Sequence, residues 1–329
     1  MQNTEAPIAR RFGNLRLVPP RTPKLAKEPF EIRYVDRPTG EIRKEVVLGD
    51  GLVRMVYERA LGRALRRALL TRRVFSRAYG RFQSSRRSTR GIGKVVSDLS
   101  IAMDDYVVPD GGFSSFNDFF TRRLRSGARP LDTAPGRVIS PADGRTFAYT
   151  HVRGDSLLPA KGRRISLARL LGGASEAEPF VDGTVVIVRL CPSDYHRFHF
   201  PCDGVASSAK TLPGPLESVN PLALAKGRAI LDHNQRDVTM IDSPTLGRVA
   251  YVEVGAMCVG RIVQSFLPGA VSAGDEKGLF EFGGSTVILV FQAGKIVVDE
   301  DLVANTDKGL ETFLKMGEGI GSGLTITPR

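Results

Sequence analysis

The stretch FGGSTVILVF, residues 282–291, decides the fold, because two glycines and a serine lead into a run of β-branched and apolar residues without a charge. Such a run, bounded by turn residues, is typical of a buried strand. Three more runs of this texture predict strands: GTVVIVRL at 183–190, GRVAYVEVGA at 247–256 and KIVVDEDL at 295–302. From residue 137 onward no comparable helical periodicity interrupts them, so the sequence predicts a β-rich body rather than a doubly wound βαβ domain.

The N-terminal part has a different texture. Apolar side chains recur at helical spacing over residues 53–69, and arginines occupy much of the remaining surface. This pattern predicts an amphipathic helix with a basic face. The polar segment SSRRSTRGIGK at 84–94 marks a boundary, so we expect a helical region over 1–94 and a second domain over 95–329. The predicted fold class is α+β, with N-terminal amphipathic helices on a β-rich C-terminal body.

Two shorter helices are expected after this boundary. One covers residues near 95–106, and the other begins in FNDFFTRRL at residue 116. Ser115 is placed to cap the second helix, and Asp118 at its third position completes a capping box. Three phenylalanines of this helix would anchor it to the body.

The formal net charge of +12 is concentrated before residue 130. It is steepest between residues 54 and 94, where only Glu58 opposes a row of basic residues. Such a block favours an anionic surface. The helix over 53–69 could lie on a membrane, with arginines at the lipid headgroups, or it could pack on the core with its arginines solvated. A nucleic-acid partner is disfavoured because few aromatic residues are interleaved and no binding motif is present.

Composition narrows the class of protein further. A chain of 329 residues with 42% hydrophobic and 25% charged residues fits a globular protein. Three scattered cysteines argue against a disulfide framework and predict a reducing, cytoplasmic compartment. The first residues contain no signal-peptide core, and no run reaches the roughly 18 apolar residues of a spanning helix.

Two of the four histidines, His196 and His199, fall together in CPSDYHRFHFPCDG at 191–204. In an extended segment they would point to opposite faces and would differ in role, whereas a helical turn would place them side by side. Ordinary loop histidines, satisfied by local hydrogen bonds, are the alternative. Cys191 and Cys202 complete a Cys-x4-His-x2-His-x2-Cys string, but its unusual spacing and its prolines disfavour zinc, so no metal site is predicted.

Ser285 directly follows the glycine pair Gly283 and Gly284. Such a pair allows strained backbone torsions and leaves the Gly284 carbonyl open to attack by the Ser285 hydroxyl, although a simple turn before a strand is the plainer interpretation. Asp143, in the turn SPADGR at 140–145, supplies an acid. With the two histidines it completes the residue types of a nucleophilic triad, whose order along a chain is not fixed.

The chain resembles the phosphatidylserine decarboxylase family along nearly its whole length. The matching strings appear in the family's order: IRYVDRPTGEI, FSSFNDFFTRRL, SPADG, YHRFHFP, PGPLESVNP, VEVGAMCVG, FGGSTVILVF and the ending GLETFLKMGEGIG. The resemblance implies a proenzyme that cuts itself between Gly284 and Ser285. The products would be a β chain, residues 1–284, and an α chain, residues 285–329. The cut would fall within the catalytic domain 95–329, and the N-terminal region 1–94 would belong to the β chain.

The resemblance also implies roles for the candidate residues. Asp143, His199 and Ser285 would form the charge-relay set for cleavage, and His196 would perform acid–base work during decarboxylation. Ser285 would become a covalent pyruvoyl cofactor that forms a Schiff base with the substrate amine. The expected reaction converts phosphatidylserine to phosphatidylethanolamine and CO2.

A lipid substrate also favours the membrane interpretation of the basic helix. We therefore expect a peripheral protein on the cytoplasmic face of the membrane, assembled from α and β chains, with a homo-oligomer left open. Three alternatives are a pyruvoyl-dependent decarboxylase of a free amino acid, a membrane-surface scaffold with a dead site, and a lipoyl-like carrier module. The carrier would use Lys308 in NTDKGLET, and it would leave Asp143, His196 and His199 without a purpose.

Overall fold

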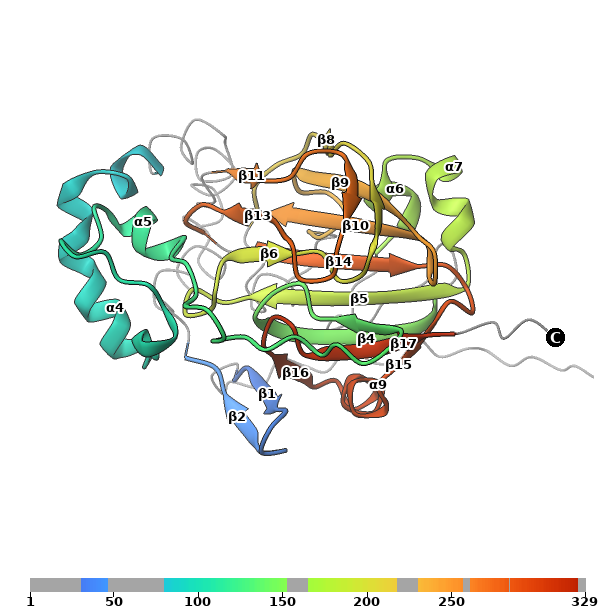
Figure 1. The fold of residues 1–329 in the computed structure, drawn as a ribbon, viewed down its shortest axis with the longest axis horizontal. Helices are drawn as coiled ribbons and strands as arrows, with labels where there is room; N and C mark the ends of the chain where they lie inside the picture. Colours follow the sequence, from blue (N-terminus) through green and yellow to red (C-terminus); the bar gives the residue numbers. More distant parts are fainter. Residues whose placement is uncertain are drawn as a thin grey trace, which may run out of the picture. The chain divides into compact units, whose positions relative to one another are not determined.

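One large, mostly antiparallel sheet forms the body of the molecule (Figure 1). The computed structural model describes residues 31–46, 80–152, 165–217, 230–256, 261–283 and 285–324. The sheet has 11 strands in the order β12-β7-β9-β10-β14-β5-β4-β16-β1-β2, with β8 paired to β9. Its strands are β1 (Arg33–Asp36), β2 (Ile42–Lys44), β4 (Gly144–Val152), β5 (Gly183–Leu190), β7 (Gly204–Ala206), β8 (Lys210–Leu212), β9 (Arg236–Ser243), β10 (Gly247–Gly255), β12 (Gly269–Val271), β14 (Ser285–Phe291) and β16 (Glu311–Leu314).

Two small sheets and several short helices complete the described chain. The first small sheet joins β11 (Ile262–Gln264), β13 (Glu276–Phe280) and β6 (Arg197–His199), and the second joins β15 (Ile296–Val298), β17 (Gly319–Gly323) and β3 (Arg137–Ile139). The α-helices are α4 (Ile92–Asp98), α5 (Phe116–Phe120), α6 (Leu167–Leu171), α7 (Ala174–Ala177) and α9 (Glu300–Asp307). The 3-10 helices are η2 (Arg86–Gly91), η3 (Met103–Asp105) and η4 (Glu178–Phe180).

The central strands are buried on both faces, which explains why their sequences read as continuous apolar runs. Along β14, Ile288 and Val290 belong to one core cluster, together with the apolar side chains of α6. Val287 and Leu289 belong to a second cluster on the other face, which also contains the aromatic rings of β6 and β13. The alternation follows from the period of two in a strand. The β-rich body predicted from sequence is confirmed.

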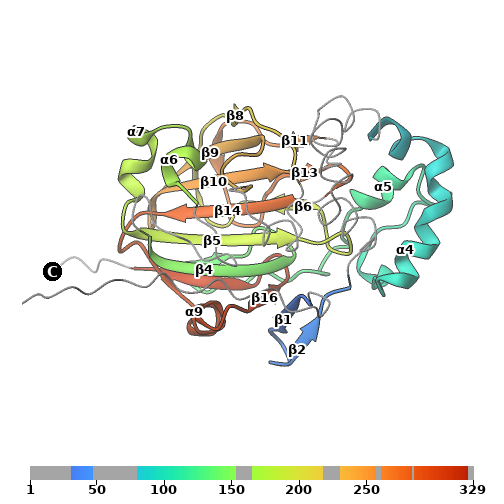
Figure 2. The same ribbon diagram turned by 180° about the vertical axis from the view of Figure 1, so that it is seen from behind.

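A third apolar cluster carries the short helices α4 and α5. It is formed by Phe116, Phe119 and Phe120 of α5, with Phe282 and side chains of α4 packed against them. Figures 1 and 2 both show α4 and α5 at the end of the sheet where β14 begins and β5 ends. The cluster therefore attaches α5 to the chain segment that precedes Ser285.

The strand predictions hold except at one position. The strands predicted at 183–190, 247–256 and 285–291 are β5, β10 and β14. The strand predicted at 295–302 is wrong in its second half, because β15 ends at Val298 and α9 begins at Glu300. Carboxylates in the first turn of a helix are favoured by its dipole, so the acidic residues after Val298 start a helix rather than extend a strand.

The helix predictions hold in part. The helix expected near 95–106 corresponds to α4, which begins earlier, is shorter and ends at Asp98. Ser100 has a φ of 51°, which is not a right-handed helical conformation, and it separates α4 from η3. Ser115 caps α5 as predicted, because its hydroxyl accepts from the Asp118 backbone N–H at 3.1 Å. The Asp118 carboxylate, however, accepts from the backbone N–H of Ser114 at 2.8 Å instead of closing the box on Ser115.

Some predictions fall outside what the structure describes. The amphipathic helix over 53–69 lies outside the described residues, and the boundary at residue 94 stays a prediction. Of the helices in the described ranges, none combines the length and apolar character that a membrane span requires. Lys308 is the C-cap residue of α9. It therefore lies at a helix end and not in the strand-to-strand hairpin that a carrier module requires.

A buried ion pair lies on the same face as the second core cluster. Lys277 and Glu253 are both completely buried and hydrogen-bonded to each other, and the lysine also donates to Gln264 at 2.8 Å. Four aromatic rings surround the ammonium group. Burial raises the pKa of Glu253 to about 7 and lowers the pKa of Lys277, so the pair is retained at a desolvation cost.

Substitution of this pair tests that cost. We expect Lys277→Met to lower the free energy of unfolding by about 3–5 kcal/mol, because Glu253 would be left buried without its cation. The double variant Glu253→Leu, Lys277→Met should recover most of that loss, because an apolar pair of similar volume needs no desolvation. Urea unfolding of the two variants measures the difference, and equal stability of both would contradict this account.

Candidate active site

Ser285 lies at the first position of β14, between the ends of two neighbouring strands. Its register partners are Gly255 of β10 and Leu190 of β5. The side chain is completely buried, and its hydroxyl has no hydrogen-bond partner within the described residues. A buried hydroxyl without a partner costs about 1–3 kcal/mol, which makes this atom a candidate for function. Gly283 has φ of 146°, a conformation open to glycine, and Gly284 lies outside the described residues.

His196 is completely buried and contacts an aromatic ring next to the same segment. Its ring packs on Phe120 in a tilted arrangement with centroids 3.7 Å apart, and Phe120 contacts Phe282 edge-on at 5.0 Å. The Nδ1 atom lies 2.9 Å from the Asp194 carbonyl oxygen. Because a carbonyl only accepts, Nδ1 carries the proton and Nε2 carries the lone pair. Nε2 has no partner within the described residues, and burial lowers the pKa of His196 to about 3, so the ring is a neutral base.

His199 has different surroundings, as expected for two histidines separated by an odd number of extended positions. Its Nδ1 donates to the Gly274 carbonyl at 2.9 Å, and its Nε2 accepts from the Tyr195 hydroxyl at 3.1 Å. Burial lowers its pKa, and the charges of Glu276 and Asp143 partly oppose that shift. His199 is therefore also neutral, but its lone pair is occupied by Tyr195.

Asp143 is held by an arginine that the sequence analysis did not identify. Arg129 donates to both carboxylate oxygens, the shortest contact being 2.7 Å from Nη2 to Oδ2, and the backbone N–H of Met316 donates at 2.8 Å. Nη1 of Arg129 also binds Asp105 at 2.8 Å. In the part of the chain that the structure describes, no hydrogen bond joins Asp143 to His199 or His199 to Ser285. The structure thus brings Asp143 within electrostatic reach of His199 without assembling a hydrogen-bonded triad.

The loop before His196 is shaped by buried charges. The Asp194 carboxylate accepts from the Cys191 backbone N–H at 2.7 Å and from Arg145. Arg122, in FFTRRL, donates to the Ser193 carbonyl at 2.8 Å. Two motifs that are far apart in the sequence therefore meet here, and each fixes the backbone that carries His196.

The Cys-x4-His-x2-His-x2-Cys string does not converge on one point. Cys191 accepts from Arg189 at 3.1 Å, Cys202 interacts with Ser243, and the two imidazoles have the separate partners given above. Across the described ranges, no three side chains of His, Cys, Asp or Glu gather as a metal would require.

A pocket of about 230 Å³ opens beside His199. Tyr195, Glu276 and Met316 line it, and so does a row of three arginines from one segment: Arg123, Arg125 and Arg129. His196 does not line this pocket, so the two histidines also differ in their access to it. The site therefore combines an opening lined by arginines with the His199 imidazole in its wall. The second imidazole, that of His196, is completely buried, and its Nε2 lone pair has no partner within the described residues.

Comparison with known proteins identifies the family of this chain. A family model described as phosphatidylserine decarboxylase matches residues 116–322. The chain belongs to the phosphatidylserine decarboxylase family. It is 41% identical over 281 residues to a phosphatidylserine decarboxylase proenzyme of Clostridium novyi, covering 85% of this chain and 95% of the relative. It is 40% identical to the proenzymes of Clostridium kluyveri and Chlamydia muridarum, covering 88% and 89% of this chain and 98% of each relative.

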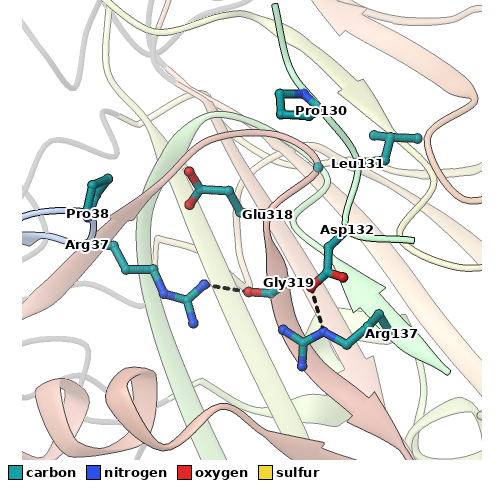
Figure 3. Close-up of a pocket in the computed structure, with 9 residues that line it drawn as sticks. Arg37, Pro38, Pro130, Leu131, Asp132, Arg137, Glu318 and Gly319 are labelled. Carbon is teal, nitrogen blue, oxygen red and sulfur yellow. Dashed lines mark hydrogen bonds and ion pairs between the residues drawn. The ribbon is translucent and has the colours of Figure 1, made fainter. Parts of the chain in front are cut away.

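A larger pocket of about 530 Å³ is lined by Arg37, Arg137, Asp132 and Glu318, among others (Figure 3). Its charges neutralise each other. Arg37 donates to the Gly319 carbonyl at 2.6 Å and binds Asp301 at 2.7 Å, while Arg137 binds Asp132 at 2.8 Å. For a member of the phosphatidylserine decarboxylase family, this pocket is therefore a weaker candidate for an anionic substrate than the one beside His199.

Proposed function

We propose that this chain is a self-processing phosphatidylserine decarboxylase, which converts phosphatidylserine to phosphatidylethanolamine and CO2. Family membership makes it a decarboxylase, a carboxy-lyase, related to enzymes made as proenzymes. The observation that carries the proposal is the buried Ser285 hydroxyl, which has no partner among the residues that the structure describes and directly follows a glycine pair at the start of β14. A residue at the first position of a buried central strand is held more rigidly than one in a loop, which suits a reacting group.

Self-cleavage would begin with proton removal from Ser285. His199 is the proposed base, and its Nε2 lone pair would exchange the Tyr195 hydroxyl for that of Ser285. Asp143 would act on His199 through its charge, which favours the protonated ring. The serine oxygen then attacks the Gly284 carbonyl and the amide becomes an ester. Elimination releases the Gly284 carboxylate and leaves dehydroalanine at 285. One water hydrolyses this residue, ammonia departs and a ketone remains.

The surroundings of residue 285 fit such a group. Its side-chain position is fully buried on a rigid strand, and no described side chain competes for it. When present, the pyruvoyl group supplies a ketone that condenses with the substrate amine and accepts the electrons released with CO2. His196 would hold or deliver a proton through Nε2, because Nδ1 is fixed on the Asp194 carbonyl. Complete burial of His196, with Phe120 packed on its ring, would exclude water from this proton.

The assembly and the location are part of the same proposal. The α chain, 285–329, and the β chain, 1–284, would remain together, because β14 pairs with β5 and β10 on both sides. The basic segment 54–94 would attract anionic lipid at the cytoplasmic face of the membrane. A free amino acid remains the alternative substrate, and it would give the basic segment no role.

His196 provides a test that separates decarboxylation from cleavage. We expect His196→Gln to be cut into two chains, while the decarboxylation rate falls by about 10²–10⁴, the usual contribution of a general acid or base. His233→Gln is the matched control, because His233 is exposed. Denaturing electrophoresis and CO2 release measure the two steps. An uncut His196→Gln chain would move this histidine into the cleavage step.

A further inference from the structure

The pocket beside His199 has cationic groups that no side chain of the described residues neutralises. Glu276 in its wall is bound by Arg197 at 2.8 Å, and Arg129 is bound by Asp143 and Asp105. Among the described residues the side chain of Arg123 has no hydrogen-bond or ion-pair partner, and the residue is exposed. The charge of the opening is therefore positive and available to a ligand.

Arg125 is oriented toward the same opening. Its Nε donates to the Tyr106 carbonyl at 2.9 Å, which leaves both terminal nitrogens without a partner among the described residues. The backbone here is fixed by a β-bridge between Tyr106 and Leu124. The Arg125 backbone N–H donates to the Asp105 carbonyl at 2.9 Å, and the Val107 backbone N–H donates to the Arg123 carbonyl at 2.9 Å. Two guanidinium groups are thus presented from a braced segment and not from a free loop.

We infer that Arg123 and Arg125 bind the phosphate of the substrate headgroup and select a phospholipid over a free amino acid. The inference rests on the proposed function, because it assigns a role in the same site. In a phosphoserine headgroup the amine and the phosphorus are separated by four bonds, so the phosphate must be bound close to the place where the amine reacts. Arg123 and Arg125 line the same pocket as His199, the proposed base of this site. A guanidinium matches a phosphate diester in charge and in its forked geometry. Free serine has no phosphate and would gain nothing from these two arginines.

The binding test uses the full-length chain with Ser285→Ala, so that it does not depend on processing. The probe is glycerophospho-L-serine, a soluble headgroup, measured by calorimetry against Arg123→Gln, Arg125→Gln and the double variant in this background. We expect each single change to weaken binding about tenfold and the double change to weaken it further. Arg33→Gln, which removes an exposed arginine from β1, is the matched control and should bind normally.

A kinetic arm uses the otherwise wild-type chain with the same substitutions. The double variant should be cut normally and should show a raised KM for glycerophospho-L-serine with kcat changed by less than about twofold, because the arginines act in binding. Equal affinity of the double variant and the control would overturn the assignment. Inorganic phosphate that binds as tightly as the headgroup would also overturn it in favour of a free-phosphate site. An uncut wild-type chain would instead contradict the proposed function, so the two failures are told apart.

Discussion

Replacing Ser285 with alanine is expected to leave the chain in one piece and to abolish decarboxylation. The serine hydroxyl is the only group at this position that can attack the preceding carbonyl, and alanine offers no oxygen for the ester. The substitution removes a buried atom that makes no hydrogen bond to any described residue, so the fold should not lose stability. Denaturing electrophoresis should show one band at full length, and CO2 release should fall to background.

The neighbouring Thr286 supplies the control for this experiment. Its hydroxyl is also buried and also lacks a partner among the described atoms, but it points to the other face of β14. Thr286→Val keeps the shape of the side chain and should be processed and active. A Ser285→Ala chain that still separates into two fragments would contradict the proposed cleavage chemistry.

The second large effect is expected at Arg129. Its side chain and that of Asp143 are each only 4% exposed, so Arg129→Met would leave a buried carboxylate with the Met316 N–H as its main partner. We expect the free energy of unfolding to fall by about 3–5 kcal/mol. Self-cleavage should also slow, because Arg129 no longer holds the Asp143 carboxylate in its position near His199.

A double variant separates these two consequences. In Arg129→Met, Asp143→Asn, the buried charge is removed with its partner, so much of the stability should return while cleavage stays slow. Urea unfolding in the Ser285→Ala background gives the stability, and the fraction of cut chain over time gives the rate. If Arg129→Met were as stable as the parent chain, the pairing would have no energetic role.

The sequence predicted the central strands because their signal is local. β5 and β14 coincide with the predicted ranges, since glycine turns bound an uninterrupted run of β-branched residues at each. The strand predicted at 295–302 is too long because KIVVDEDL contains both the strand β15 and the start of the helix α9. Consecutive acidic residues after Val298 are themselves a signal for a helix start, and that signal was available in the sequence.

The site was predictable in its residue types but not in its contacts. Asp143, His196, His199 and Ser285 stand in recognisable motifs. The link from Arg129 to Asp143 joins two loops that no periodicity relates, and the contact of Phe120 with His196 joins α5 to the loop before β6. The hydroxyl of Tyr195 on His199 was within the quoted motif. The sequence does not predict this hydrogen bond, because the direction of a tyrosine side chain beside two histidines depends on the backbone conformation.

The intact mass of the purified chains tests the central claim most directly. We predict two polypeptides, one ending at Gly284 and one beginning at residue 285, the second lighter than a serine-led chain by the mass of one ammonia. That difference follows from exchange of the serine amine and hydroxyl for a ketone. An active preparation that contains a single unbroken chain with the mass of the full sequence would contradict the account.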